Sequence, residues 1–130
     1  GLVEMPLGTK VANFIYDIGE GGTNGRDIKA IQTGGPSGGC IPADMFDTPV
    51  DYESLQAAGS IMGSGGLVVL DDRNCAVDIA HYFLSFTQAE SCGKCPPCRA
   101  GTARMLDILK RIKAGQGTLA DLERLEIITE

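Results

Sequence analysis

The stretch Glu90-Ser-Cys-Gly-Lys-Cys-Pro-Pro-Cys-Arg-Ala-Gly101 holds three of the five cysteines of this 130-residue chain. Cys92, Cys95 and Cys98 are each separated by two residues, so three thiols fall on one tight loop, a common arrangement for an iron–sulfur cluster. Gly93 permits a sharp turn, and the two prolines fix the backbone that follows. The spacing therefore predicts a metal site with sulfur ligands at residues 92–98.

The fourth ligand of such a site is not evident in the sequence. The short ferredoxin pattern would place a cysteine at position 102, where Thr102 stands, and no cysteine follows Cys98. Either Cys40 or Cys75 supplies the ligand, or it lies beyond Glu130. Free cysteines are most often small buried hydrophobic residues, and we expect that role for Cys40 and Cys75.

A zinc site, or three free thiols, is the alternative interpretation of the cysteine loop. Structural zinc usually pairs one C-x2-C element with a second, distant pair of ligands, and the sequence has no such pair. His81 lies eleven residues upstream in an apolar stretch, a setting typical of a core or surface histidine. An odd number of cysteines, three of them closely spaced, disfavours a disulfide framework and favours metal binding in a reducing compartment.

Composition limits the function further. Hydrophobic residues make up 43% of the chain and charged residues 22%, as in a globular domain. The net charge of −6 argues against a general nucleic-acid-binding protein. No apolar run is long enough to cross a membrane, and no signal peptide is visible, so we expect no transmembrane segment and a cytoplasmic location. Residues 91–130 carry a net charge of +2 against −8 for residues 1–90, which suits an anionic cluster at the cysteine loop.

The first part of the chain predicts a small α+β unit. Residues 1–70 hold 14 of the 18 glycines and alternate short apolar runs with turns. The expected elements are a helix over 11–18 between an N-cap at Thr9 and a stop at Gly19, a strand over 27–32, a helix over 51–58 and a strand over 66–70. The loops at 34–39 and 63–66 lack the glycine patterns of phosphate-binding loops, so we interpret them as turns.

From residue 74 onward the pattern predicts three helices. The first runs from an N-cap at Asn74 to about Gln88, with a buried face of Val77, Ala80, Phe83, Leu84 and Thr87. The second has Pro97 in its first turn, a stop at Gly115 or Gly117, and an apolar stripe of Met105, Leu106, Leu109 and Ile112. The third begins at a capping box formed by Thr118 and Asp121, and Leu119, Leu122, Leu125 and Ile128 line it. Three helices around a cysteine loop form a small bundle.

The segment Ser91-Cys-Gly-Lys-Cys-Pro-Pro-Cys-Arg99 resembles the cluster motif of the flavin-binding, NADH-handling subunit of respiratory complex I and its relatives. Those relatives include NAD(P)-linked iron hydrogenases, some of them electron-bifurcating, and NAD-dependent formate dehydrogenases. Three further segments look most like the hydrogenase branch: Gly34-Gly-Pro-Ser-Gly-Gly-Cys-Ile-Pro42, Asp51-Tyr-Glu-Ser-Leu55 and Gly59-Ser-Ile-Met-Gly-Ser-Gly-Gly66. The resemblance thus covers nearly the whole chain.

The resemblance implies a β-grasp module of the soluble-ligand-binding type over 1–73 and a helical [4Fe–4S] domain over 74–130. It also implies that Cys92, Cys95 and Cys98 are three of four cluster ligands, with the fourth cysteine expected past Glu130. Electrons in this family pass from NAD(P)H to FMN and then to the cluster, within a multi-subunit oxidoreductase that includes a further iron–sulfur subunit. The flavin and nucleotide domain is expected to precede residue 1, so the chain alone is expected to be inactive.

The sequence supports two hypotheses of function. The first is electron transfer in an NAD(P)H-linked flavin and iron–sulfur oxidoreductase of the hydrogenase or NADH dehydrogenase type. The second is a subunit-docking module whose cysteine loop binds a structural zinc or no metal.

Overall fold

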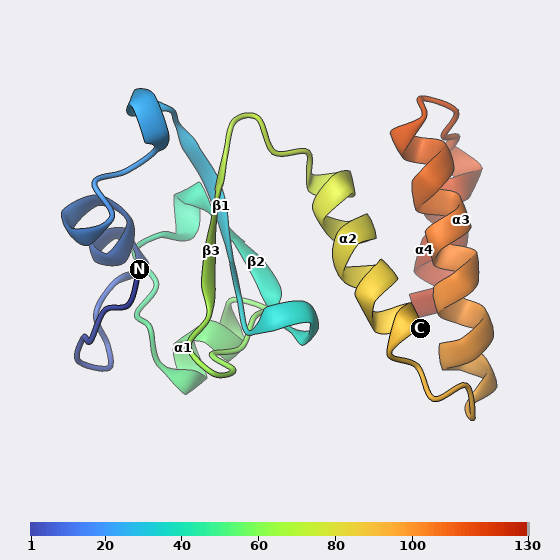
Figure 1. Ribbon diagram of the computed structural model, residues 1–130, viewed down its shortest axis with the longest axis horizontal. Coiled ribbons are helices and arrows are strands. Elements are labelled where there is room, and N and C mark those ends of the chain that lie inside the picture. The colour runs from blue at the N-terminus through green and yellow to red at the C-terminus, as the bar shows by residue number, and fades with distance from the viewer. Residues whose placement is uncertain (130) are drawn as a thin grey trace. The chain divides into compact units, whose positions relative to one another are not determined.

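The computed structural model describes residues 1–129, and the chain divides into two compact units, Gly1–Arg73 and Asn74–Glu130 (Figure 1). The first unit contains a three-stranded sheet with short helices. The second is helical. The coarse expectation of a mixed α and β fold is therefore confirmed.

The sheet of the first unit has the strand order β2-β1-β3, with both pairings antiparallel. Its strands are β1 (Ile28–Thr33), β2 (Gly39–Pro42) and β3 (Leu67–Asp71). In the central strand, Ile31 pairs with Ile41 of β2 and Val69 of β3. The strands expected at 27–32 and 66–70 are confirmed within one residue. Strand β2 was not predicted, because four residues that begin with glycine and end with proline resemble a loop. Proline is tolerated in β2 because this strand lies at the edge of the sheet.

Helices in the first unit are short. Residues 11 and 12 begin a helix that continues as the π-helix η1 (Asn13–Ile18), in which the Gly19 N–H donates to the Phe14 carbonyl at 3.1 Å. The expected stop at Gly19 is confirmed. The expected N-cap at Thr9 is wrong, because the Thr9 hydroxyl donates back to the Pro6 carbonyl at 2.7 Å. The remaining helices are the 3₁₀ turns η2 (Thr23–Gly25), η3 (Gly35–Ser37) and η4 (Ala43–Met45), and α1 (Tyr52–Ala57).

Helix α1 begins where the sequence predicts. The Asp51 carboxylate accepts a hydrogen bond from the Ser54 backbone N–H at 2.7 Å, which satisfies one of the free donors of the first helical turn. Leu55, one turn into the helix, is buried. Asp51 thus fixes the helix start and Leu55 its inward face.

A single hydrophobic core holds the first unit together. Its buried members come from the sheet, from the helix at 11–18, from α1 and from the 43–46 turn: Val11, Ile15, Ile28, Ile31, Ile41, Phe46 and Leu55. Ile31 and Ile41 are fully buried on neighbouring strands. Burial of such side chains contributes about 1.5–3 kcal/mol each, so this cluster is the main source of stability in the first unit.

The two glycine-rich loops pack against each other. A Cβ on Gly34, whose φ is +78°, would lie 2.3 Å from Ile61 Cγ1, and a Cβ on Gly38 would lie 1.6 Å from the Thr33 carbonyl oxygen. The interpretation of these loops as turns is thereby supported. Beside them the Thr33 hydroxyl lies 2.6 Å from the Ser60 hydroxyl and donates to the Ile61 carbonyl at 2.8 Å. These buried polar groups satisfy one another, which holds the loops in one arrangement.

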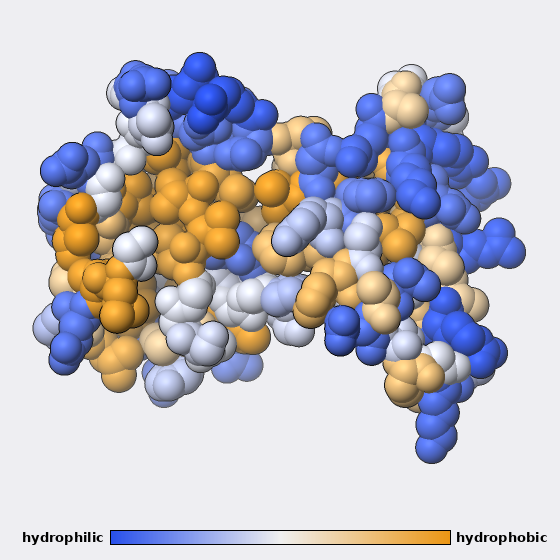
Figure 2. Space-filling view, in the orientation of Figure 1, coloured by the Kyte–Doolittle hydropathy of each residue, from blue (hydrophilic) through white to orange (hydrophobic). Residues whose placement is uncertain are grey.

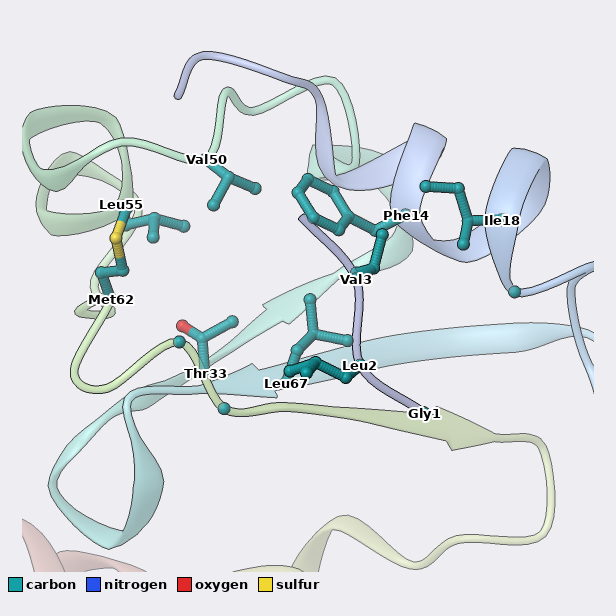
Figure 3. Close-up of a pocket in the computed structure, with 13 residues that line it drawn as sticks. Gly1, Leu2, Val3, Phe14, Ile18, Thr33, Val50, Leu55, Met62 and Leu67 are labelled. Carbon is teal, nitrogen blue, oxygen red and sulfur yellow. The ribbon is translucent and has the colours of Figure 1, made fainter. Parts of the chain in front are cut away.

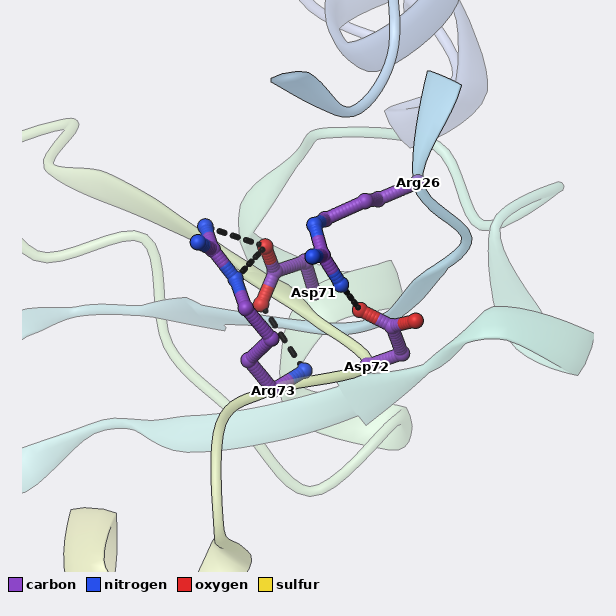
Figure 4. Close-up of polar contacts among 4 residues, drawn as sticks. All are labelled: Arg26, Asp71, Asp72 and Arg73. Carbon is purple, nitrogen blue, oxygen red and sulfur yellow. Dashed lines mark hydrogen bonds and ion pairs between the residues drawn. The ribbon is translucent and has the colours of Figure 1, made fainter. Parts of the chain in front are cut away.

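Paired charges hold the end of the first unit (Figure 4). The Arg73 guanidinium donates to Asp71 at 2.9 and 3.0 Å, and Arg26 donates to Asp72 at 2.9 Å. The hydrogen bonds from Arg73 hold the pKa of the Asp71 carboxyl below its usual range. Because Arg26, Asp72 and Arg73 are exposed or partly exposed, these pairs contribute little to stability, but they define the path of the chain as it leaves β3.

The second unit contains α2 (Ala76–Ala89), α3 (Thr102–Lys113) and α4 (Leu119–Thr129), with the π-helix η5 (Pro97–Gly101) leading into α3. Proline at the start of this helical run is confirmed. The expected N-cap at Asn74 is wrong by one residue, since Cys75 occupies the N-cap position and makes no side-chain capping bond. Helix α3 ends at Lys113 with Ala114 as its C-cap, and Gly115 follows with a φ of +72°, so Gly115 rather than Gly117 provides the stop.

Burial in the second unit is concentrated on α3. Leu106, Ile108 and Leu109 are buried, and Met105 and Ile112 are partly buried. The buried face expected for α2 is only partly present: Val77, Phe83 and Leu84 are partly buried, whereas Ala80 and Thr87 are exposed. On α4, Leu119 and Leu122 are exposed, contrary to expectation, while Leu125 and Ile128 are partly buried. On each helix, other elements pack against only part of the apolar stripe. The periodicity of the sequence predicts the stripe but not the fraction of the stripe that is buried.

Of the capping box expected at the start of α4, the bond to the Asp121 side chain is confirmed. The Asp121 carboxylate accepts bonds from the backbone N–H and the hydroxyl of Thr118, both at 3.0 Å, and pairs with Arg111 of α3. Its side chain is 3% exposed. Asp121 therefore links the start of α4 to α3. The backbone N–H of Thr118 is the main cause that lowers the pKa of the Asp121 carboxyl, and its hydroxyl and Arg111 act in the same direction.

A pH dependence of stability follows from this lowered pKa. The folded state keeps the Asp121 carboxylate charged to lower pH than the unfolded state does, so its contribution is present above the unfolded-state pKa of about 3.9 and is lost as the pH falls through the folded-state pKa. We expect Asp121→Asn to lower the melting temperature at about pH 7 and to flatten its fall below about pH 4. Circular dichroism melts of both proteins check this, and an unchanged acid slope in the variant would contradict it.

Candidate metal centre

The cysteine loop joins α2 to α3. Gly93 has a φ of +74°, a left-handed conformation that favours glycine, and this turn separates Cys92 from Cys95. The Arg99 guanidinium donates to the Gly93 carbonyl at 2.8 Å and closes the loop from its far end. Cys98 lies within η5, and its carbonyl accepts a bond from the Thr102 hydroxyl at 2.5 Å. The loop is therefore held at both ends by its own residues.

All three thiols of the loop are free and exposed. Iron–sulfur clusters are held by cysteine thiolates, so the donor atoms are of the required type and three of the usual four are present on one loop. Among residues 1–129, however, no three Cys, His, Asp or Glu side chains are gathered closely enough to hold a metal ion. The three thiols are chemically suited to hold a cluster. Binding would require the loop to change conformation so that the three sulfur atoms lie closer together.

The other two cysteines lie outside the loop in the sequence. Cys40 and Cys75 are both exposed, which corrects the expectation that they are buried hydrophobic residues. Cys40 lies on the edge strand β2 next to the buried Ile41, so its side chain points to the opposite face of the sheet, and Cys75 lies at the N-cap of α2. Partial burial of the thiol itself still raises the pKa of Cys40.

His81 is partly buried on α2, and its Nε2 is enclosed with no hydrogen-bond partner among residues 1–129. The expectation of a core or surface histidine stays a prediction, and the structure places the residue between these two settings.

The first unit contains a groove of about 400 Å³ beneath its N-terminal segment (Figure 3). Val3, Phe14 and Ile18 line one side, and Leu67 of β3 lies opposite them. None of the thirteen lining residues has a charged side chain, and Thr33 is the polar exception. The groove offers apolar surface and no residue suited to acid–base or nucleophilic chemistry.

Comparison with known proteins finds relatives along the whole chain. Residues 78–130 match the NADH-ubiquinone oxidoreductase-F iron–sulfur binding region. All 130 residues align at 52% identity with the HndC subunit of the NADP-reducing hydrogenase of Solidesulfovibrio fructosivorans, and 128 residues align at 42% identity with the F 2 subunit of the NADH-quinone oxidoreductase of Rhizobium meliloti. The chain spans 26% and 30% of the lengths of these two relatives.

The fold has a close relative among solved structures. A crystal structure of NAD⁺-reducing [NiFe]-hydrogenase in the H₂-reduced state superposes with a TM-score of 0.78 at 32% identity, over 95% of this chain and 20% of that one. The resemblance inferred from the cysteine loop and the glycine-rich segments is thus confirmed. Residues 78–130 thus match the NADH-ubiquinone oxidoreductase-F iron–sulfur binding region, and the chain as a whole is similar to part of a hydrogenase subunit and of NADH-quinone oxidoreductase subunits.

Proposed function

We propose that Cys92, Cys95 and Cys98 are three of the ligands of a [4Fe–4S] cluster that carries electrons in an NAD(P)H-linked oxidoreductase. The observation that supports this most directly is the presence of three free, exposed thiols on one closed loop, inside the segment that matches the family's iron–sulfur binding region. A bound cluster of this type supplies a one-electron carrier. The loop residues bind and orient it, and the residues around them set its charge environment.

Basic side chains around the loop suit this role. Lys94, Arg99 and Arg104 are exposed on and just after the loop. A cluster bound by four thiolates is an anion, so nearby cations stabilise it, and the more so when an electron is added. The sign of the local charge therefore supports a cluster rather than a site for a free cation.

The domain assignment is part of the same proposal. Residues 1–73 form the β-grasp module, and residues 74–130 form the helical iron–sulfur domain, which a fourth cysteine outside this chain completes. FMN and NAD(P) bind elsewhere in the whole protein, which works in the cytoplasm with other subunits, including a further iron–sulfur subunit. The names of the relatives, which are subunits of a hydrogenase and of NADH-quinone oxidoreductases, support this arrangement. No helix among residues 1–129 is both long and apolar enough to span a membrane.

The test is the metal content of the protein as it occurs naturally, prepared without oxygen. We expect cluster iron at about four atoms per chain for this site and an EPR signal of a reduced [4Fe–4S] cluster after dithionite treatment. Stoichiometric zinc, or no metal at Cys92, Cys95 and Cys98, would contradict the proposal.

Subunit docking is a second candidate function, compatible with the first. Exposed apolar side chains favour it: Tyr82 and Phe86 on α2, and Leu122 and Ile127 on α4. Hydrophobic residues also cover much of the visible face of the first unit (Figure 2). If docking were the sole role, the protein would contain zinc or no metal, and capture of a partner subunit would survive Cys→Ser changes in the loop.

A further inference from the structure

The hydroxyl of Ser91 lies between two groups of the cysteine loop. Its Oγ is 3.2 Å from Cys98 Sγ, and the Gly93 backbone N–H donates to the same oxygen at 3.2 Å. A serine hydroxyl has one proton to donate and two lone pairs to accept with. Because the Gly93 N–H can only donate, it occupies a lone pair, and the hydroxyl proton remains available for the sulfur of Cys98.

The loop holds this contact in place. The N–H of Gly93 is bound to Ser91 and its carbonyl to Arg99, so the residue that positions the serine is held through both of its peptide groups. Cys98 is held through its carbonyl by Thr102. Ser91 is partly buried whereas Cys98 is exposed, so water competes less for the hydroxyl than for the free side of the thiol.

We propose that Ser91 positions Cys98 and makes the bound cluster easier to reduce by donating its O–H to the Cys98 thiolate. This inference rests on the proposed function. Hydrogen bonds to charged acceptors are stronger than those to neutral ones, and added electron density on the sulfur strengthens the bond further. Hydrogen bonds to cluster sulfurs are one of the means by which a protein sets the reduction potential. The reduction adds one electron, from the flavin in the working protein or from dithionite in the measurement, and Ser91 keeps its proton.

The experiment compares the natural full-length protein with Ser91→Ala and Ser91→Thr, using potentiometric EPR on anaerobic samples. Alanine removes the donor, and threonine retains a hydroxyl at the same atom. Ser85→Ala is the matched control, because it deletes a hydroxyl in the same unit that donates to the His81 carbonyl within α2 at 2.7 Å. We expect Ser91→Ala to lower the equilibrium constant for reduction by about two- to tenfold, where tenfold corresponds to 59 mV for a one-electron couple. Ser91→Thr and Ser85→Ala should leave it unchanged.

A second measurement reports on the hydrogen bond itself. Electron–nuclear double resonance of the reduced protein in H₂O and D₂O detects exchangeable protons close to the cluster. A coupled exchangeable proton should be present in the natural protein and in Ser91→Thr and absent from Ser91→Ala. If Ser91→Ala fails to assemble the cluster, the natural protein and Ser91→Thr still test the inference. Absence of the exchangeable-proton coupling from both of these proteins would overturn it.

The outcomes separate this inference from the proposed function. A cluster that is present in Ser91→Ala with unchanged potential and unchanged proton coupling would overturn the role of Ser91 and leave the cluster assignment standing. Absence of a cluster from the natural protein would instead overturn the proposed function, and the inference with it.

Discussion

Cys95→Ser is expected to abolish cluster binding while the first unit stays folded. Three thiols lie on the loop, and this substitution removes the middle one, leaving two that lie six residues apart. Since iron–sulfur clusters require thiolate ligands, the expected loss is nearly all the iron of this site, about four atoms per chain. Iron analysis and the EPR spectrum of the reduced protein measure the loss.

Cys75→Ser is the matched control for that variant. Cys75 is also a free, exposed thiol of the second unit, but it occupies the N-cap of α2, where serine is well tolerated. Its iron content should equal that of the natural protein. Folding of the first unit is followed through the amide NMR signals of Thr33 and Ser60, which are buried beside the glycine-rich loops. Loss of these signals in Cys95→Ser would refute the independence of the two units, and iron retained at full occupancy would refute the ligand assignment.

Gly38→Ala is expected to have the largest effect on the stability of the first unit. Its φ of −86° is accessible to alanine, so the backbone conformation itself is not the obstacle. The obstacle is contact: the new Cβ would lie 1.6 Å from the Thr33 carbonyl oxygen and 2.9 Å from Gly34 Cα. Both neighbours are backbone atoms, which cannot move aside as a flexible side chain can. Overpacking of this kind typically costs 1–3 kcal/mol, and we expect a loss of about 3 kcal/mol in the free energy of unfolding.

Gly66→Ala serves as the control for steric contact. A Cβ on Gly66 meets no atom within 4 Å, so the change should stay within about 0.5 kcal/mol of the parent. Urea denaturation of the two variants and the parent, followed by circular dichroism, gives the comparison. Equal stabilities of Gly38→Ala and Gly66→Ala would show that the turn at residues 33–38 can open without cost, contrary to the close approach of Gly38 to Thr33 and Gly34.

Much of the second unit's layout could be predicted from local patterns. The positions of the helices, the capping box at Thr118 and the stop at Gly115 depend on residues close together in the chain, and local sequence carries that information. The apolar stripes were less predictable. Leu119 and Leu122 have the same spacing as buried residues yet lie exposed, because burial depends on what packs against a helix and not on its own period.

By itself the sequence predicted three sulfur ligands at fixed spacing, and the chain order alone places these three cysteines on one loop. It also predicted the resemblance to hydrogenase and NADH-quinone oxidoreductase subunits, through the combination of that loop with the glycine-rich segments, and the comparisons confirm it. Only the tertiary structure showed that Gly34 is required by contact with Ile61, which is distant in sequence, and Gly38 by contact with the Thr33 carbonyl of its own turn. The structure alone also showed that Cys40 and Cys75 are exposed and that the Ser91 hydroxyl lies against Cys98. The physical reason is that ligand identity is a property of residues, whereas burial, close approach and hydrogen-bond direction depend on atoms that folding brings together.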